Sequence, residues 1–170
     1  LFEIFEKGDI YDNIDLIIEK SLRIKKRVVE EDEKESGLRR ILNFGHTLGH
    51  GIESESGLDG LYHGECVALG MIPMCSKRVR ERLIPTLERL GLPTVIEGDL
   101  ETILNIAAHD KKRSGSDISV VWVEEIGSCE IKKSNSDGFS AVFVEEIGKG
   151  AVKTVTFAQM KDILEGAWKA

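Results

Sequence analysis

Three of the four histidines in the chain lie close together, in a segment that could bind a metal ion or transfer protons. His46 and His50 are four residues apart in "LNFGHTLGHGIE", and His63 follows in "YHGE". On a helix this spacing places His46 and His50 one turn apart on one face, with Glu53 on roughly the same face. Two such imidazoles can hold one metal ion, or one can be a ligand beside an acid–base group. Each histidine could also be an ordinary core or surface residue.

Glycines surround the histidine pair, at Gly45, Gly49 and Gly51. A glycine inside a helix costs about 1 kcal/mol relative to alanine, so three of them require a reason. The close approach of a substrate or of another backbone is one explanation, and a tight helix crossing is the other. The sequence leaves both explanations open.

Positively charged residues form a second group that could do chemistry, by binding an anion. Lys25, Arg39, Lys111 and Lys112 lie on predicted helices or at helix ends. Together with imidazoles, such residues could bind a phosphate group. Each of them could equally be a solvated surface charge, as could Glu35 in the acidic cluster that precedes Gly37.

Helices must position these residues, and most of the chain has helical periodicity. Apolar residues recur at helical spacing from Leu1 to about Val29, which predicts a helical segment there. A second helix is expected to start near Leu38 or Asn43 and to continue through the histidine pair. The glycines of Ser56–Gly64 predict a loop.

Four more helices are expected further along the chain. The segment from Glu65 to Val79 is apolar on nearly every side, which indicates a buried helix. A short helix should follow and end at Gly91, because Pro93 prevents its continuation. The segments 99–113 and 156–170 are amphipathic, and Thr156 is a suitable N-cap for the last helix.

A change of period between the last two helices predicts β-structure. The segments "ISVVWVEEIG" and "FSAVFVEEIG" are rich in β-branched and aromatic residues. Lys111–Ile131 aligns without gaps on Lys132–Val152 at an offset of 21 residues, with nine identical positions. This tandem duplication predicts a strand, a turn at "EEIG" and a short return strand in each copy, with one copy native to the fold and the other inserted. The expected fold class is therefore mainly α, with a small β-hairpin element near the C-terminus.

The composition is that of a soluble globular protein, with 41% hydrophobic and 31% charged residues. The sequence has no run of 18 or more apolar residues and does not start with a charged-then-apolar leader, so we expect neither a membrane span nor a signal peptide. The net charge of −7 argues against nucleic-acid binding. Three cysteines without a CxxC spacing indicate a reduced, cytoplasmic compartment. The length of 170 residues is that of one domain, so we expect residues 1–170 to form a single helical domain. Because the first residue is Leu1 rather than Met, we expect the chain to be a fragment.

The motifs resemble those of a known enzyme family. "KKRVVEEDEKESGLRRILNFGHTLGHGIE", "HGECVALGM", "LGLPT" and "HDKK" occur in the order found in the C-terminal domain of 3-dehydroquinate synthase, a sugar-phosphate cyclase. The resemblance runs from about Leu1 to Gly127. It implies a helical C-terminal domain that carries most of the metal and substrate ligands, next to an N-terminal NAD-binding domain that this chain lacks. It also implies a phosphorylated small-molecule substrate and a homodimer in the full-length enzyme.

The resemblance also implies roles for the candidate residues. His46 and His63 would bind a catalytic zinc (or cobalt) ion, together with a glutamate from a helix upstream of Leu1. His50 would transfer protons beside the substrate, and Glu35 matches the glutamate of the same motif. The substrate's carboxylate, hydroxyl and phosphate groups would be bound by Lys25, Arg39, Asn43 and a lysine of the "DKK" motif, either Lys111 or Lys112.

The reaction implied by the resemblance is a carbon–oxygen lyase reaction of the shikimate pathway, in aromatic amino acid biosynthesis. It converts 3-deoxy-D-arabino-heptulosonate 7-phosphate to 3-dehydroquinate and phosphate. The chain alone is expected to be inactive, because it lacks the NAD-binding domain and one metal ligand. Two alternatives remain: another sugar-phosphate cyclase, of the inosose or valiolone synthase type, or a non-catalytic, stand-alone helical binding module.

Overall fold

The computed structural model describes residues 1–34, 37–57, 60–96, 98–112, 119–135, 138–144, 154–155 and 166. They divide into two units, Leu1–Leu42 and Asn43–Ala170, which are described in turn. The mainly helical fold class is confirmed. Within the described residues, no helix has both the length and the apolar character needed to cross a membrane.

The first unit begins with two helices joined by a turn. Helix α1 (Phe2–Lys7) ends at Gly8, and α2 (Ile14–Glu31) starts after the turn. In the turn, the carboxylate of Asp9 accepts hydrogen bonds from two backbone N–H groups, at 2.8 and 3.2 Å. The prediction of one helical segment from Leu1 to about Val29 is wrong here, because the aspartate satisfies backbone donors in a turn instead of a helix.

A buried carboxylate organises the loop that follows α2. Oδ2 of Asp32, a residue only 9% exposed, accepts hydrogen bonds from the N–H groups of Gly37 at 2.7 Å and Arg39 at 3.0 Å. The 3-10 helix η1 (Leu38–Asn43) begins within this loop. The second predicted helix therefore starts as a 3-10 helix and becomes an α-helix only at His46.

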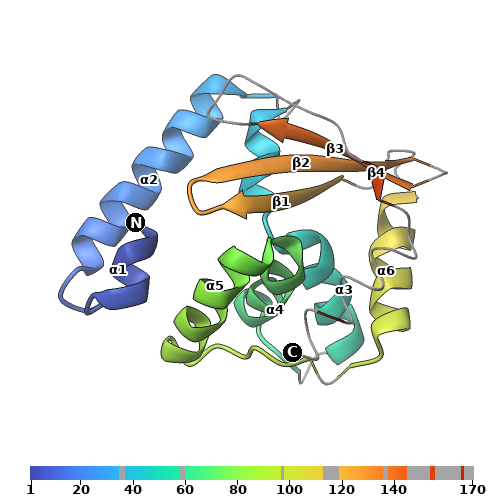
Figure 1. The fold of residues 1–170 in the computed structure, drawn as a ribbon, viewed down its shortest axis with the longest axis horizontal. Coiled ribbons are helices and arrows are strands. Elements are labelled where there is room, and N and C mark those ends of the chain that lie inside the picture. The colour runs from blue at the N-terminus through green and yellow to red at the C-terminus, as the bar shows by residue number, and fades with distance from the viewer. Residues whose placement is uncertain are drawn as a thin grey trace. The chain divides into compact units, whose positions relative to one another are not determined.

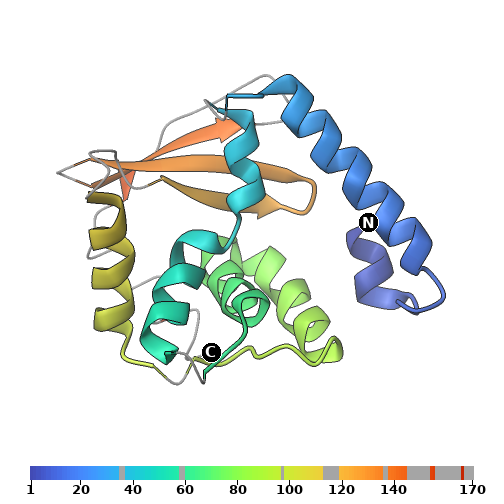
Figure 2. The same cartoon turned by 180° about the vertical axis from the view of Figure 1, so that it is seen from behind.

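The second unit is built around the two helices that carry the histidines. Helix α3 (His46–Ser56) packs against α4 (His63–Met71), and α6 (Leu100–Lys112) packs against α3 (Figures 1 and 2). Burying each large apolar side chain contributes about 1.5–3 kcal/mol, so this core fixes how the helices cross. The fully buried large side chains of the core are Ile52, Leu69, Ile72, Met74 and Ile103.

The buried helix predicted from Glu65 to Val79 is shorter than expected. Helix α4 ends at Met71, and a 3-10 turn, η2 (Ile72–Met74), follows. Pro73 lies in that turn, and a proline has no N–H and clashes with the carbonyl group four residues earlier in an α-helix. The apolar run therefore continues as buried chain but not as one helix.

Helix α5 (Lys77–Arg89) is longer than the short helix predicted before Gly91. Its first turn is capped by Ser76, whose Oγ accepts a hydrogen bond from the N–H of Val79 at 3.3 Å. Gly91 has a φ of 71°, a conformation that favours glycine after a helix end, which confirms the predicted stop.

The β element is a four-stranded antiparallel sheet in chain order, next to the helices of its unit (Figure 1). Its strands are β1 (Ser119–Glu125), β2 (Ser128–Asn135), β3 (Gly138–Val144) and β4 (Thr154–Val155). The turn predicted at the first "EEIG" is confirmed, with Gly127 at a φ of 97°. The sheet is larger than one hairpin, because the strands of the second copy add to it. The second "EEIG" turn and the predicted N-cap Thr156 lie outside the described residues.

Backbone and side-chain contacts hold β1 to the start of α5. The N–H of Ser76 donates to the carbonyl oxygen of Val123 at 3.0 Å, and its Oγ donates to that of Glu124 at 2.7 Å. Arg78 forms an ion pair with Glu125 at 2.9 Å. These contacts fix the sheet to the N-terminal end of α5.

Candidate metal centre

Helices α3 and α4 bring the three predicted histidines together. His46 begins α3, His50 follows one turn later, and His63 begins α4. The ring centroids of His46 and His50 are 5.9 Å apart, and each is 5.6 Å from that of His63. We call these three imidazoles the histidine cluster.

The histidine cluster exists because glycines let the helices cross at very short distance. A Cβ atom on Gly49 would lie 3.0 Å from the Cα atom of Val67 in α4, and one on Gly51 would lie 2.7 Å from a carbonyl oxygen of α6. A Cβ atom on Gly70 would overlap the carbonyl oxygen of Gly45. Close approach of another backbone at a tight crossing therefore accounts for these glycines, and no substrate contact is needed to explain them.

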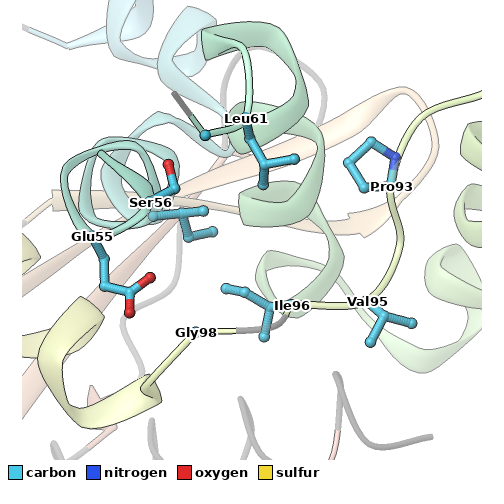
Figure 3. A pocket seen from close by; sticks show the side chains of 9 residues that line it. Glu55, Ser56, Leu61, Pro93, Val95, Ile96 and Gly98 are labelled. Carbon is cyan, nitrogen blue, oxygen red and sulfur yellow. The ribbon is translucent and has the colours of Figure 1, made fainter. Parts of the chain in front are cut away.

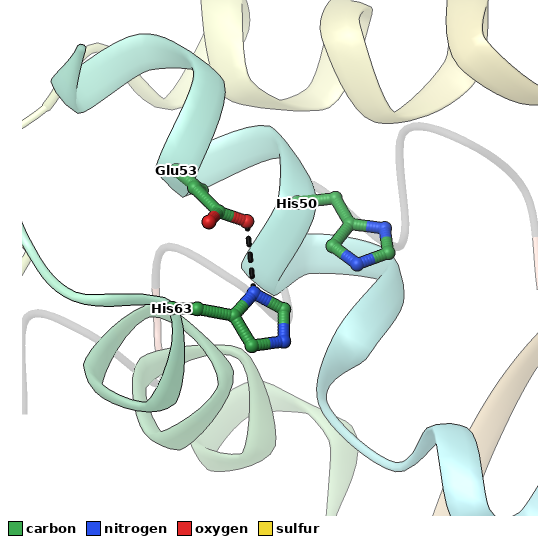
Figure 4. Close-up of side chains that lie close together, drawn as sticks. All are labelled: His50, Glu53 and His63. Carbon is green, nitrogen blue, oxygen red and sulfur yellow. Dashed lines mark hydrogen bonds and ion pairs between the residues drawn. The ribbon is translucent and has the colours of Figure 1, made fainter. Parts of the chain in front are cut away.

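Glu53 adds a carboxylate to the histidine cluster (Figure 4). Its Oε2 lies 2.9 Å from Nδ1 of His63, and one ligand atom each from His50, Glu53 and His63 lie within 4.8 Å of one another. Imidazole nitrogens and carboxylate oxygens are the donors that zinc prefers, so these residues fit a divalent metal ion. Sequence reasoning placed Glu53 on this helix face but gave it no role; its three-residue spacing from His50 was the available signal.

His46 differs from His50 in its surroundings. Nδ1 of the half-buried His46 lies 3.2 Å from the carbonyl oxygen of Phe44, whereas His50 is exposed. A proton on Nδ1, shared with that carbonyl, leaves Nε2 of His46 able to bind a metal. Yet within the described residues the group at ligand distance contains His50 instead of His46. The assignment of His46 and His63 as ligands, and of His50 as the proton-transfer residue, stays a prediction.

A buried thiol lies close to the carboxylates of this region. Burial raises the pKa of the Cys66 thiol, and the negative charges of Glu53 and Glu65 raise it further. A thiol with a raised pKa stays protonated at neutral pH and is a poor metal ligand. The imidazoles and carboxylate are therefore the better donors.

The predicted substrate-binding residues lie partly in the first unit. Lys25 is exposed on α2, and Nη1 of Arg39 donates a hydrogen bond to the carbonyl oxygen of Glu33 at 3.1 Å. Asn43 is the last residue of η1 and lies just before His46 in the chain. The convergence of Lys25 and Arg39 with the histidine cluster stays a prediction.

Three further predicted site residues are described only in part. Lys111 and Lys112 are the last residues of α6, and their description stops at the backbone. Glu35 lies outside the described residues. The roles assigned to these residues stay predictions.

A cavity of about 490 Å³ lies at the C-terminal end of α3 (Figure 3). Glu55 on its wall accepts a hydrogen bond from the N–H of Asp99 at 3.4 Å. The lining, as far as the structure describes it, contains no member of the histidine cluster, so the cavity is separate from the metal centre. Most of its wall is apolar, formed by Ile52, Leu61, Pro93, Val95 and Ile96.

Comparisons with known proteins find relatives for most of the chain. Residues 3–113 match the family described as "3-dehydroquinate synthase C-terminal". A protein named 3-dehydroquinate synthase from Clostridium acetobutylicum is 40% identical over 146 residues, which cover 80% of this chain and 41% of the relative. A protein of the same name from Acetivibrio thermocellus is 44% identical, over 62% of this chain and 32% of the relative. Another from Streptococcus pneumoniae is 36% identical, over 72% of this chain and 37% of the relative. The chain spans about two fifths or less of the length of these relatives.

Proposed function

The chain belongs to the 3-dehydroquinate synthase C-terminal family, and on that premise we propose that it supplies the metal- and substrate-binding part of a cytoplasmic 3-dehydroquinate synthase. The reaction would convert 3-deoxy-D-arabino-heptulosonate 7-phosphate to 3-dehydroquinate and phosphate, in the shikimate pathway. The observation that carries this proposal is the histidine cluster with Glu53 beside it. An NAD-binding domain would form the other part of the full-length enzyme, which we propose to be a homodimer.

The metal would be zinc or cobalt, held by His46 and His63 together with a glutamate from outside this chain. A metal bound there supplies positive charge that lowers the pKa of a coordinated substrate hydroxyl, and bound NAD supplies transient oxidation of the substrate. The side chains themselves fix where the substrate hydroxyl lies relative to His50. The tight crossing of α3 and α4 supports this role, because it holds the imidazole of His63 at a fixed distance from those of His46 and His50.

His50 would move a proton between the substrate and solvent through a ring nitrogen. Its ring is exposed and lies 5.9 Å from that of His46, so it can face a substrate held at the histidine cluster. General acid–base catalysis by a positioned side chain contributes roughly 10²–10⁴-fold to a rate. We propose that Glu35 assists this proton transfer.

The basic residues would bind the carboxylate and phosphate groups of the substrate. Arg39 can bind a carboxylate or phosphate through two parallel N–H groups, and Lys25 can add a point charge. Lys111 or Lys112 would reach the substrate from the end of α6, and Asn43 would bind its hydroxyl groups.

Turnover by the full-length enzyme tests the proposed reaction against that of another sugar-phosphate cyclase. We expect activity on the seven-carbon acid phosphate, and none on sedoheptulose 7-phosphate or glucose 6-phosphate. His50→Ala should lower kcat by roughly 10²–10⁴-fold, whereas Glu55→Gln, outside the histidine cluster, should not. Activity on a neutral sugar phosphate alone would assign the chain to an inosose or valiolone synthase type.

A non-catalytic, stand-alone binding module is the alternative to a catalytic domain. The 170-residue chain alone should not turn over substrate, under either candidate. A continuous reading frame upstream that encodes a dinucleotide-binding domain would exclude the stand-alone module.

A further inference from the structure

We propose that Glu53 is a positioning residue of the metal centre, whose carboxylate holds a proton on Nδ1 of His63 and leaves Nε2 as the metal-binding atom. The inference rests on the metal-binding role proposed above. It concerns a side chain to which neither the sequence motifs nor the names of the relatives assign a role.

The contact between Glu53 and His63 joins two different helices. Oε2 of Glu53 lies 2.9 Å from Nδ1 of His63, although the two side chains are 42% and 51% exposed. Holding two half-exposed side chains in one geometry costs conformational entropy, and fixed backbones reduce that cost. The crossing at Gly49 and Val67, where a Cβ atom would touch the opposite backbone, supplies that constraint.

The other nearby glutamate, Glu65, forms a different hydrogen bond. Oε2 of Glu65 accepts a hydrogen bond from the N–H of Tyr62 at 2.7 Å and thereby caps the first turn of α4. That cap fixes the helix start where His63 lies. Among the described residues, Glu53 is therefore the carboxylate that is bonded to an imidazole of the histidine cluster.

The protonated nitrogen of a neutral imidazole is set by the hydrogen bond that the ring makes. A carboxylate accepts but cannot donate, so it favours the Nδ1–H form of His63 and leaves the lone pair of Nε2 free for a metal. The alternative is that Glu53 binds the metal directly, since its ligand atom also lies near that of His50. Glutamine separates the two roles, because its amide oxygen still accepts a hydrogen bond but is a poor ligand for zinc.

The first measurement is the tautomer of His63 in the metal-free 170-residue chain, read from nitrogen–proton correlation spectra at a pH where the ring is neutral. We expect the Nδ1–H form in the wild type and in Glu53→Gln, and a shift toward the Nε2–H form in Glu53→Ala. Glu55→Gln, a matched change on the same helix outside the histidine cluster, should have no effect. An Nε2–H tautomer in the wild type, or an unchanged tautomer in Glu53→Ala, would overturn the proposal.

The second measurement is the affinity of the same variants for Zn²⁺ by calorimetry. Glu53→Ala should weaken binding about 10–100-fold and Glu53→Gln by no more than about threefold. Equal losses in the two variants would make Glu53 a direct ligand and overturn the positioning role. If His46→Ala and His63→Ala leave the affinity unchanged while the tautomer still depends on Glu53, the proposed metal site fails and the contact is upheld.

A separate observation concerns the register of the sheet. Ile131 of β2 faces Val121 of β1 on one side and Val142 of β3 on the other. Val121 and Val142 are corresponding residues of the two repeats, since the offset is 21 residues. The strands β1 and β3 therefore present equivalent residues at the same positions along β2.

The second hairpin repeats the pairing of the first. Ser140 of β3 faces Thr154 of β4, and the residues 21 positions earlier in the chain, Ser119 and Lys133, also face each other. The sheet thus has a two-strand unit that recurs with the sequence repeat.

The residues that hold β1 to α5 are the ones that the second copy preserves. Ser76 and Arg78 contact Val123, Glu124 and Glu125. The corresponding positions of the second copy are also Val-Glu-Glu, at residues 144–146. We infer that the two copies are interchangeable, and that either can supply the strand that lies against α5.

Deletions test this inference in the 170-residue chain. Removal of Lys111–Ile131 or of Lys132–Val152 should each leave a folded chain whose Tm changes by no more than about 4 °C. The first deletion joins Asp110 to Lys132 and so keeps the sequence "HDKK". Loss of folding in only one of these variants would show that one copy is indispensable and would overturn the inference.

A matched pair of deletions separates register from length. Removal of Val121–Ala141 joins Val120 to Val142 and keeps the repeat in register, whereas removal of Trp122–Ala141 leaves one extra residue in the strand. A one-residue shift sends side chains to the opposite face of a sheet. The in-register variant should keep its Tm, and the other should lose well over 4 °C; equal Tm values in the two variants would also overturn the inference.

Discussion

The Cα atom of Val67 lies 3.0 Å from the place where a Cβ atom on Gly49 would stand. His50 follows Gly49 directly in α3, and His63 begins the helix that contains Val67. This backbone contact therefore sets the distance between the imidazoles of the two helices.

Gly49→Ala should separate α3 from α4, because the added methyl group meets backbone atoms that cannot move as a flexible side chain would. We expect the free energy of unfolding to fall by about 1–3 kcal/mol, the cost of overpacking, as measured by urea denaturation. Gly64→Ala is the matched control, since a Cβ atom there meets open space. It should be neutral or stabilising by up to about 1 kcal/mol; equal destabilisation by both changes would contradict the crossing as the cause.

The loop that carries Arg39 depends on the buried carboxylate of Asp32. Asp32→Ala leaves the N–H groups of Gly37 and Arg39 without this acceptor, so we expect a loss of about 1–3 kcal/mol in urea denaturation. Asp32→Asn keeps an acceptor oxygen and should lose less. Glu33→Ala keeps the backbone carbonyl that Arg39 contacts and should change stability little; a loss as large as that of Asp32→Ala would contradict the role of the carboxylate.

The Cys75 thiol should make stability depend on alkaline pH. Burial raises its pKa from the usual 9.0 to about 11, while the charge of Arg80 opposes the shift. Because the folded chain holds this proton more tightly than the unfolded chain, the stabilisation is complete below pH 9 and is lost as the pH rises to about 11. The loss should be of order 2–3 kcal/mol, from about 1.4 kcal/mol per pKa unit.

Urea denaturation of the wild type and of Cys75→Ala, at several pH values between 8 and about 11, measures how much stability the protonated Cys75 thiol contributes. The difference in stability between the two proteins should shrink across that range. A difference that does not change with pH would mean that the thiol does not titrate as its burial requires.

Periodicity and residue types predict much of the fold, and they predict which histidines belong to the candidate metal centre. The spacing of His46 and His50 predicts one helix face, and the β-branched repeats predict strands that the structure confirms. The break at Gly8 and the helix end at Met71 are not visible in apolar periodicity, because a single aspartate turn and one proline decide them.

Contacts between helices could not be predicted from spacing within one helix. The bond between Glu53 and His63 spans α3 and α4, and its existence depends on how closely the glycines let those helices approach. The choice between a substrate contact and a helix crossing for Gly49 likewise required the position of Val67. Local sequence patterns specify which face a side chain occupies, but not which neighbouring helix it meets.

The most direct test of the central claim is a calorimetric Zn²⁺ titration of the wild type, His46→Ala, His50→Ala and His63→Ala. The account predicts weak binding by the chain, a loss of about tenfold or more for His46→Ala and for His63→Ala, and a change within about threefold for His50→Ala. Circular dichroism of each variant controls for folding. A large loss in His50→Ala with unchanged affinity in His46→Ala would contradict the account, because the metal would then belong to His50, Glu53 and His63.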